Sequence, residues 1–190
     1  MMVTTIIDAT ARVLAEHGFS GTTTNRIAER AGISVGSLYQ YFPSREAVVA
    51  AVAERYSERM KASLESLLVQ TQSQDLKTSL YQMLSGITDA HDADPELSKV
   101  IATELPRLGD MDWRHDMATR GVAIAEALLL AHSQELRDDL DVKSAAYVVA
   151  KASEAILVSI TQNPQNENAA AIEQALLEML YLFLTAKLIG

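Results

Sequence analysis

The chain has 190 residues, of which 48% are hydrophobic and 22% charged, and its formal net charge is −9. This composition excludes a disordered chain, and the length allows one domain or two small ones with a buried core. Because cysteine is absent, disulfide frameworks and thiolate metal sites are excluded, and a cytoplasmic location is expected. No uncharged apolar run reaches the roughly 20 residues of a membrane-spanning helix, so no membrane partner is expected.

The charges are unevenly distributed along the chain. Residues 1–60 carry six basic and six acidic side chains, whereas residues 61–190 carry ten basic and nineteen acidic ones. Between Thr24 and Arg45, three arginines stand against one glutamate. An acidic protein with a small basic island is expected to contact a polyanion at that island, if anywhere.

Three short helices are predicted at the N-terminus. The first is expected to end at Gly18, a residue suited to a left-handed conformation after a helix. Thr24 is predicted to cap the second helix, which ends at Gly32. Ser34 is predicted to cap a third helix that runs to about Tyr41. Two short helices joined by a glycine turn are typical of a motif that places one helix in a DNA groove.

The remainder of the chain is also predicted to be helical. Ser44 is expected to cap a long fourth helix, and Asp94 is a possible cap for a later one. Apolar residues spaced three or four apart predict five further helices, over residues 76–87, 95–105, 113–128, 142–161 and 169–188. The expected fold is all-α, with about nine helices. We expect a helix-turn-helix domain over 1–46 and a second helical domain over 47–190, to which the family resemblance described below assigns effector binding and dimerisation.

The residue types in the third helix suit contact with duplex DNA. Gly36 has no side chain and allows the helix to approach the base edges closely. Gln40 can pair with adenine, and Val35 can pack on a thymine methyl group. A simpler interpretation exists, since helix pairs of this kind also occur in proteins that never contact DNA, and Tyr39 and Tyr41 could be packing residues. The clustered hydroxyl groups and the aromatic pair favour DNA binding.

Residues 15–19, 22–24, 27–34 and 36–47 together resemble the TetR family of transcriptional repressors, with nearly gapless spacing. The resemblance implies a homodimer that binds a palindromic operator on double-stranded DNA and is released by a small-molecule effector. It also implies that the third helix enters the major groove and that Thr24 holds a phosphate. The DNA-contacting residues expected by position are Thr24, Asn25, Ser34, Val35, Gly36, Ser37, Tyr39, Gln40, Tyr41 and Arg45.

The chain departs from this family at two positions of the third helix. Many relatives carry Lys or Arg at the position of Val35 and often His at the position of Tyr41. Because fewer cations displace fewer counterions, modest DNA affinity with a shallow dependence on salt is expected.

An effector pocket is expected among the middle helices. Their inward-facing residues form an ordinary core in the simpler interpretation, but bundles can also host an apolar cavity with one or two polar groups that orient a ligand. Glu104 or His91 would supply such a group. The candidate lining residues are Met83, Ile87, His91, Ile101, Glu104, Trp113, Met117 and Ile124.

The last two predicted helices are more apolar than the surface of a monomer. Two such helix pairs from two chains would form a four-helix interface, as in the resembled family. Burial within one chain is the alternative. The residues expected at the dimer interface are Val149, Ala152, Ile156, Ile160, Leu176, Leu180 and Phe183.

Two competing functions remain open at this stage. The pairs His91-Asp92 and His115-Asp116 could serve a metal-dependent helical hydrolase, although no HExxH or similar spacing accompanies them. The chain could also be a ligand-binding dimer without DNA activity. The sequence favours a regulator that is not an enzyme and that holds no cofactor or metal.

Overall fold

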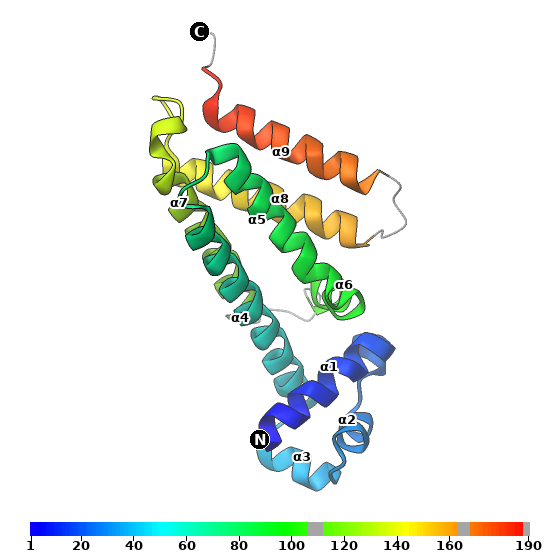
Figure 1. The fold of residues 1–190 in the computed structure, drawn as a ribbon. Helices are drawn as coiled ribbons and strands as arrows, with labels where there is room; N and C mark the ends of the chain where they lie inside the picture. Colours follow the sequence, from blue (N-terminus) through cyan, green and yellow to red (C-terminus); the bar gives the residue numbers. More distant parts are fainter. Residues whose placement is uncertain (106–111, 163–167, 188–190) are drawn as a thin grey trace. The chain divides into compact units, whose positions relative to one another are not determined.

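The computed structural model describes residues 1–105, 112–162 and 168–187, with the backbone alone for residues 112–118 and 161. Within these ranges the chain forms nine α-helices and no strand, so the predicted all-α fold is confirmed (Figure 1). In this part of the chain, no helix is both long and apolar enough to cross a bilayer. The chain divides into two compact units: unit 1 contains Met1–Arg59 and Asp94–His115, and unit 2 contains Met60–Ala93 and Asp116–Gly190.

Unit 1 is built around a small apolar centre shared by its first four helices. These are α1 (Met2–Gly21), α2 (Thr24–Ala31), α3 (Val35–Tyr41) and the first part of α4 (Arg45–Thr71). Each of them contributes one residue to the centre, and these residues are Ile6, Ile27, Leu38 and Val48. Helix α6 (Pro95–Thr103) belongs to the same unit and packs against α1. The short helices α2 and α3 are therefore held by burial of their apolar sides.

Local side-chain caps begin two further helices of unit 1, as predicted. The Ser44 hydroxyl accepts a 3.1 Å hydrogen bond from the backbone N–H of Ala47 at the start of α4. The Asp94 carboxylate accepts a 3.2 Å bond from the N–H of Leu97 at the start of α6. Each cap satisfies a backbone donor that has no partner within its helix.

The end of α1 differs in detail from the prediction. Gly18 has the expected positive φ of 64°, but its ψ of 179° is extended rather than left-handed helical. The chain therefore bends at Gly18 and forms one further turn up to Gly21. The Thr22 hydroxyl donates a 2.7 Å hydrogen bond to the Gly18 carbonyl and closes this turn.

Unit 2 contains the second part of α4, together with α5 (Leu76–Asp92), most of α7 (Asp112–Ala131), the short 3₁₀ helix η2 (Ser133–Glu135), α8 (Val142–Gln162) and α9 (Ala169–Thr185). Helices α5, α8 and α9 contact one another (Figure 1). The core of unit 2 is mainly leucine and alanine, and it includes Leu80, Leu176 and Leu180 of these helices together with Leu129 of α7.

A buried polar network joins three segments of unit 2. His132, only 5% exposed, follows α7, and its Nδ1 lies 2.9 Å from the carbonyl oxygen of Leu128. Its Nε2 lies 3.0 Å from the hydroxyl of Ser79 on α5. The same hydroxyl donates a 3.2 Å hydrogen bond to the carbonyl of Thr71 at the end of α4. The network therefore satisfies polar groups that would be costly to bury alone.

Candidate nucleic-acid interface

The turn between α2 and α3 has the geometry that a helix-turn-helix requires. Gly32 adopts a left-handed conformation (φ 70°, ψ 32°) and ends α2. The N–H of Ile33 then donates to the carbonyl of Ala28 at 3.0 Å, which satisfies one of the last carbonyls of α2. Ser34 caps α3 as predicted, because its hydroxyl accepts a 3.0 Å hydrogen bond from the N–H of Ser37.

The cap of α2 is one residue earlier than predicted. Thr23, not Thr24, has the extended backbone of a cap, and its hydroxyl accepts a 3.3 Å hydrogen bond from the N–H of Arg26. Thr24 is the first residue of the helix and is half-buried. The Thr24 hydroxyl therefore does not cap the helix. Thr24 still lies at the helix N-terminus, where backbone N–H groups can face an anion.

The ten residues predicted to contact DNA all retain accessible surface in the structure. Helix α3 turns Leu38 into the core, at 1% exposure, and leaves Tyr39 and Tyr41 at 52% and 46% exposure. The exposed residues among the ten are Asn25, Ser34, Gly36, Tyr39, Gln40 and Tyr41. The half-buried ones are Thr24, Val35, Ser37 and Arg45. Two large aromatic side chains on a seven-residue helix therefore face solvent beside hydroxyl and amide groups.

Arg45 is held at the start of α4 by three contacts. Its guanidinium lies 4.1 Å from the centre of the Phe19 ring, and its Nε donates a 2.9 Å hydrogen bond to Glu46. Its Nη1 donates to the carbonyl of Thr22 at 3.4 Å. These contacts fix the cation close to the helix-turn-helix, where a phosphate would have to replace Glu46 as its partner.

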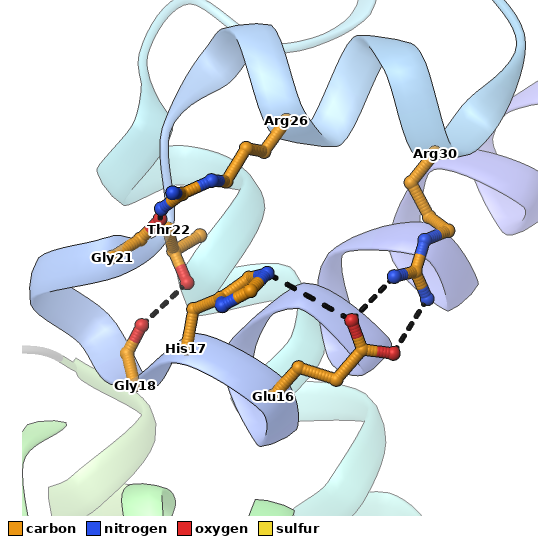
Figure 2. A network of polar contacts seen from close by, with 7 residues as sticks. All are labelled: Glu16, His17, Gly18, Gly21, Thr22, Arg26 and Arg30. Carbon is orange, nitrogen blue, oxygen red and sulfur yellow. Dashed lines mark hydrogen bonds and ion pairs between the residues drawn. The ribbon is translucent and has the colours of Figure 1, made fainter.

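The other two arginines of the basic island are engaged in holding the helices together (Figure 2). Arg30 of α2 pairs with both carboxylate oxygens of Glu16 on α1, and the Arg26 Nη1 donates a 2.6 Å hydrogen bond to the carbonyl of Gly21. The hydrogen bond from Arg30 is the main cause that lowers the pKa of Glu16. Two of the three arginines in the basic island predicted from the sequence therefore stabilise the fold of unit 1.

Glu104, one of the predicted pocket residues, is engaged within unit 1. Its carboxylate accepts a 2.8 Å hydrogen bond from the backbone N–H of Phe19, where α1 bends. A Cβ on Gly18 would lie 3.1 Å from the same carboxylate, so the glycine also allows this approach. The prediction that Glu104 orients an effector stays a prediction, and the structure gives its carboxylate a structural contact with α1.

The remaining predicted pocket residues are divided between the two units. Ile101 is buried in unit 1, whereas Met83 is buried in the core of unit 2. Ile87, His91 and Ile124 of unit 2 are half-buried. The side chains of Trp113 and Met117 lie outside the described residues.

His91 is half-buried in unit 2. Burial is the main cause that lowers its pKa, and the neighbouring Asp92 opposes that shift. A lowered pKa favours the neutral imidazole, which is consistent with a hydrogen-bonding group at the edge of a pocket as well as with a packed side chain.

The predicted dimer residues lie deeper than expected. Val149, Leu176 and Leu180 are 6%, 2% and 1% exposed within the single chain, so they form the core of unit 2 and cannot face a partner. The sequence interpretation was wrong for these three because an apolar stripe does not reveal which of two apolar faces turns inward. The other predicted residues are half-buried, and they are Ala152, Ile156, Ile160 and Phe183.

A second apolar face of the same helices was not predicted. Tyr147 and Val148 of α8 are 58% and 43% exposed, and Met179 and Leu182 of α9 are 48% and 60% exposed. The signal was present in the sequence, because small and large apolar residues recur at helical spacing on the outer side of α9. Ala171 and Ala175 lie on this exposed side as well. Large contiguous areas of this kind are typical of contact surfaces, whereas single exposed apolar residues are ordinary.

Among the described residues there is no group of three or more His, Cys, Asp or Glu side chains placed to hold a metal ion. Asp92 is exposed beside the half-buried His91. The side chains of His115 and Asp116 lie outside the described residues. Of the two predicted His-Asp pairs, only His91-Asp92 can therefore be compared with a metal site.

Two family models together match most of the chain. Residues 6–52 match the family "Bacterial regulatory proteins, tetR family", and residues 75–184 match "Tetracyclin repressor-like, C-terminal domain". The first model covers α2, the glycine turn and α3. The second covers more than half of the chain, so the resemblance extends beyond the N-terminal region on which the sequence interpretation was based.

Related proteins agree with this assignment. The fatty acid metabolism regulator protein of Bacillus subtilis is 24% identical over 185 residues, which cover 92% of this chain and 91% of the relative. The HTH-type transcriptional repressor KstR of Mycolicibacterium smegmatis is 35% identical over 60 residues, which cover 32% of this chain and 29% of KstR.

Solved structures share the fold over nearly the whole chain. The crystal structure of FadR from Bacillus subtilis in complex with stearoyl-CoA has a TM-score of 0.75 at 24% identity and covers 94% of this chain and 97% of that one. SmeT, the repressor of the Stenotrophomonas maltophilia multidrug efflux pump SmeDEF, has a TM-score of 0.75 at 20% identity, with coverages of 99% and 92%. With both family models matched in order along one all-helical chain, this protein belongs to the tetR family of bacterial transcriptional regulators.

Proposed function

We propose that this protein is a repressor that binds a palindromic operator as a homodimer in the cytoplasm and is released from it by a small molecule. Residues 1–46 would carry DNA recognition, and residues 47–190 would carry effector binding and dimerisation. The observation that carries the proposal is the outer face of α3, where Tyr39, Gln40 and Tyr41 are exposed while Leu38 anchors the helix. Two such helices in a dimer would read half-sites about 34–36 Å apart, one helical turn of DNA.

Selection of binding sites from a random pool of duplex DNA tests this proposal directly. We expect enrichment of a sequence with two-fold symmetry. Tyr39→Ala should weaken binding to the selected operator. Tyr81→Ala is the control and should not weaken it, because Tyr81 lies on α5, although it is exposed to a similar extent at 57%. A pool without enrichment would favour a ligand-binding dimer without DNA activity.

The proposed dimer uses the exposed faces of α8 and α9. The support is that two neighbouring helices each expose two apolar side chains, namely Tyr147, Val148, Met179 and Leu182. Light scattering of the wild type should give twice the 20.7 kDa chain mass. Leu182→Glu should shift the protein towards monomer, whereas Val69→Glu, at an equally exposed position of α4, should leave the mass unchanged.

A fatty acyl-CoA is the effector class that we propose. The support is the similarity over most of the chain to a fatty acid metabolism regulator and to a structure that holds stearoyl-CoA. Unit 2 offers an apolar interior, mainly of leucine and alanine, that suits an acyl chain. Stearoyl-CoA should raise the unfolding temperature and release the operator. A tenfold loss of DNA affinity requires about 1.4 kcal/mol of coupling.

We propose that the effector acts on the DNA-binding domain through α6. Helix α6 lies within the matched C-terminal family region, but it belongs to the same compact unit as α1, α2 and α3. The bond from Phe19 to Glu104 at its end ties it to α1. A ligand that displaces α6 would therefore displace α1 and, with it, the recognition helix. Such a ligand must bind the displaced state better than the DNA-bound one.

Few unpaired cations are available near the recognition helix. Arg26 donates to a backbone carbonyl, Arg30 pairs with Glu16, and Arg45 bonds Glu46. Since counterion release scales with the number of phosphates that cations neutralise, we expect DNA affinity to depend only weakly on salt concentration.

A further inference from the structure

Unit 1 contains a polar cleft of about 180 Å³ that the proposed operator and effector contacts do not use. It lies between α1, α4 and the start of α6, with Ala11, Val52 and Leu97 as its apolar part. Three arginines and two aspartates share the cleft with a tyrosine, and these residues are Asp8, Arg12, Arg55, Tyr56, Arg59 and Asp94.

Both carboxylates of the cleft already have partners. Asp8 forms an ion pair with Arg55, with 2.6 Å between Oδ1 of Asp8 and Nη1 of Arg55. Asp94 caps α6 through its 3.2 Å bond with the N–H of Leu97, where the positive end of the helix dipole offsets its charge. The Asp8–Arg55 pair is therefore neutral, and Asp94 adds one negative charge that the helix dipole offsets in part.

Two guanidinium groups of the cleft have no direct carboxylate partner among the described residues. Throughout the described ranges, neither Arg12 nor Arg59 forms an ion pair with a carboxylate, and both residues are exposed. The two acidic residues one turn from Arg12 are Asp8, which is paired with Arg55, and Glu16, which is engaged by Arg30. Three arginines against two aspartates give this concave surface a formal charge of +1, a local exception in a chain whose net charge is −9. Such a surface attracts small anions.

Tyr56 adds a fixed hydroxyl to this wall. Its oxygen lies 3.0 Å from the hydroxyl of Ser98 on α6. Burial is the main cause that raises the pKa of Tyr56, and Asp94 adds to the shift while Arg59 opposes it. The phenol therefore stays protonated at neutral pH, as a hydrogen-bonding group beside the guanidinium of Arg59.

We propose that this cleft binds a phosphate or diphosphate group of a small molecule between the guanidinium groups of Arg12 and Arg59. A phosphate monoester carries about −1.5 to −2 charges at pH 7, and it would be held by the two guanidinium groups that have no carboxylate partner in the described part of the chain. Guanidinium groups bind phosphate oxygens through paired N–H donors. The volume suits such a group rather than a whole drug-sized ligand, since pockets for those measure about 300–1,000 Å³.

The proposed site would act on unit 1 as a brace. An anion held by Arg12 and Arg59 joins α1 to α4 next to the first residue of α6. Its binding would stabilise the packing of these three helices by mass action. The inference goes beyond the proposed function, because it depends neither on operator binding nor on an acyl chain in unit 2.

The test uses the full chain in a buffer free of phosphate and sulfate, at constant ionic strength. Inorganic phosphate, pyrophosphate and coenzyme A are titrated separately, and binding is followed by calorimetry and by the unfolding temperature. We expect pyrophosphate and coenzyme A to bind and to raise the unfolding temperature. The double variant Arg12→Gln/Arg59→Gln should bind each at least tenfold more weakly. Lys99→Gln, which removes an exposed cation of α6 outside the cleft, should bind them like the wild type.

Three outcomes would overturn the inference. One is the absence of binding by all three anions, and another is equal binding by the wild type and the double variant. The third is a double variant that loses operator affinity while the wild type binds none of the anions, since Arg12 and Arg59 would then contact DNA phosphates. Circular dichroism establishes that the double variant is folded, and Arg12→Lys, which keeps the charge, should retain part of the affinity. If the wild type binds these anions but no operator, the proposed function is rejected and the anion site stands.

Discussion

The carboxylate of Glu104 accepts a 2.8 Å hydrogen bond from the backbone N–H of Phe19, a residue 85 positions earlier in the chain. The bend at Gly18 is the reason that this N–H needs a partner, because the helical hydrogen-bond pattern of α1 is interrupted there. Phe19 itself is buried under the guanidinium of Arg45. One contact therefore connects the end of α6 to the residue on which Arg45, a predicted DNA contact, is stacked.

Glu104→Ala should lower the free energy of unfolding, because it leaves the N–H of Phe19 without its partner. The expected loss is about 1–3 kcal/mol, the cost of an unsatisfied buried donor. Urea unfolding measures it. Glu96→Ala is the matched control, since Glu96 is exposed in the first turn of the same helix and its removal should cost less. Equal losses in the two variants would show that the contact contributes nothing specific.

Gly36→Ala should separate DNA binding from stability. A Cβ at this position would meet only the Ser34 hydroxyl at 3.8 Å, an ordinary contact, so the protomer can accept it. Replacement of glycine by alanine inside a helix typically adds about 0.5–1 kcal/mol of stability. The added methyl group would, however, stand between α3 and the base edges. We expect an unchanged or higher unfolding temperature together with weaker operator binding in fluorescence anisotropy.

Gly32→Ala is the comparison for that variant. Gly32 also has open space around it, but its φ of +70° strains any residue with a Cβ. This variant should lower the unfolding temperature, whereas Gly32→Asn should lower it less, because asparagine tolerates the left-handed conformation. If Gly36→Ala bound the operator like the wild type, the close approach of α3 to DNA would be rejected.

The parts of the fold that depend on neighbouring residues could be predicted from the sequence. Ser34, Ser44 and Asp94 cap their helices as expected because a cap is a contact over three residues. The cap of α2 was misplaced by one residue since consecutive threonines offer the same side chain at each position. Thr23 is the cap because it, rather than Thr24, has the extended backbone.

Contacts between distant residues could not be predicted in the same way. Nothing near Glu104 in the sequence indicates that its partner is the N–H of Phe19, so an inward-facing carboxylate was interpreted as part of a pocket. The apolar stripe of Leu176 and Leu180 has the right period for either a core or an interface, and it faces the core. The charge of the basic island was visible, but the pairing of Arg30 with Glu16 depends on how α1 and α2 cross.

Ser79→Ala should destabilise unit 2 through the His132 network. The Ser79 hydroxyl donates to the carbonyl of Thr71 and lies 3.0 Å from the Nε2 of His132, and both Ser79 and His132 are buried. Its removal takes one of two contacts from each group, since the Thr71 carbonyl also accepts from the N–H of Gln74 and the His132 Nε2 also lies 3.2 Å from the Gln74 carbonyl. The expected cost is that of one ordinary hydrogen bond, about 0.5–1.5 kcal/mol. Ser66→Ala removes a hydroxyl from an exposed position of α4 and should change the free energy of unfolding by less than about 0.5 kcal/mol. A Ser79→Ala variant as stable as Ser66→Ala would show that the network does not support the fold.

The stability of the protein towards acid should depend on Asp75. Hydrogen bonds from the backbone N–H and the hydroxyl of Thr78 lower the pKa of Asp75 from its ordinary value of 3.8. The carboxylate therefore contributes to stability fully above about pH 4, and the contribution declines as the pH falls below 3.8 and through the lowered pKa. Asp75→Asn keeps a capping oxygen but cannot titrate, so its unfolding temperature should fall less steeply between about pH 4 and pH 2. Asp89→Asn, at an exposed position in the last turn of α5, controls for the loss of one charge. Parallel curves for the wild type and Asp75→Asn would show that the cap does not couple protonation to folding.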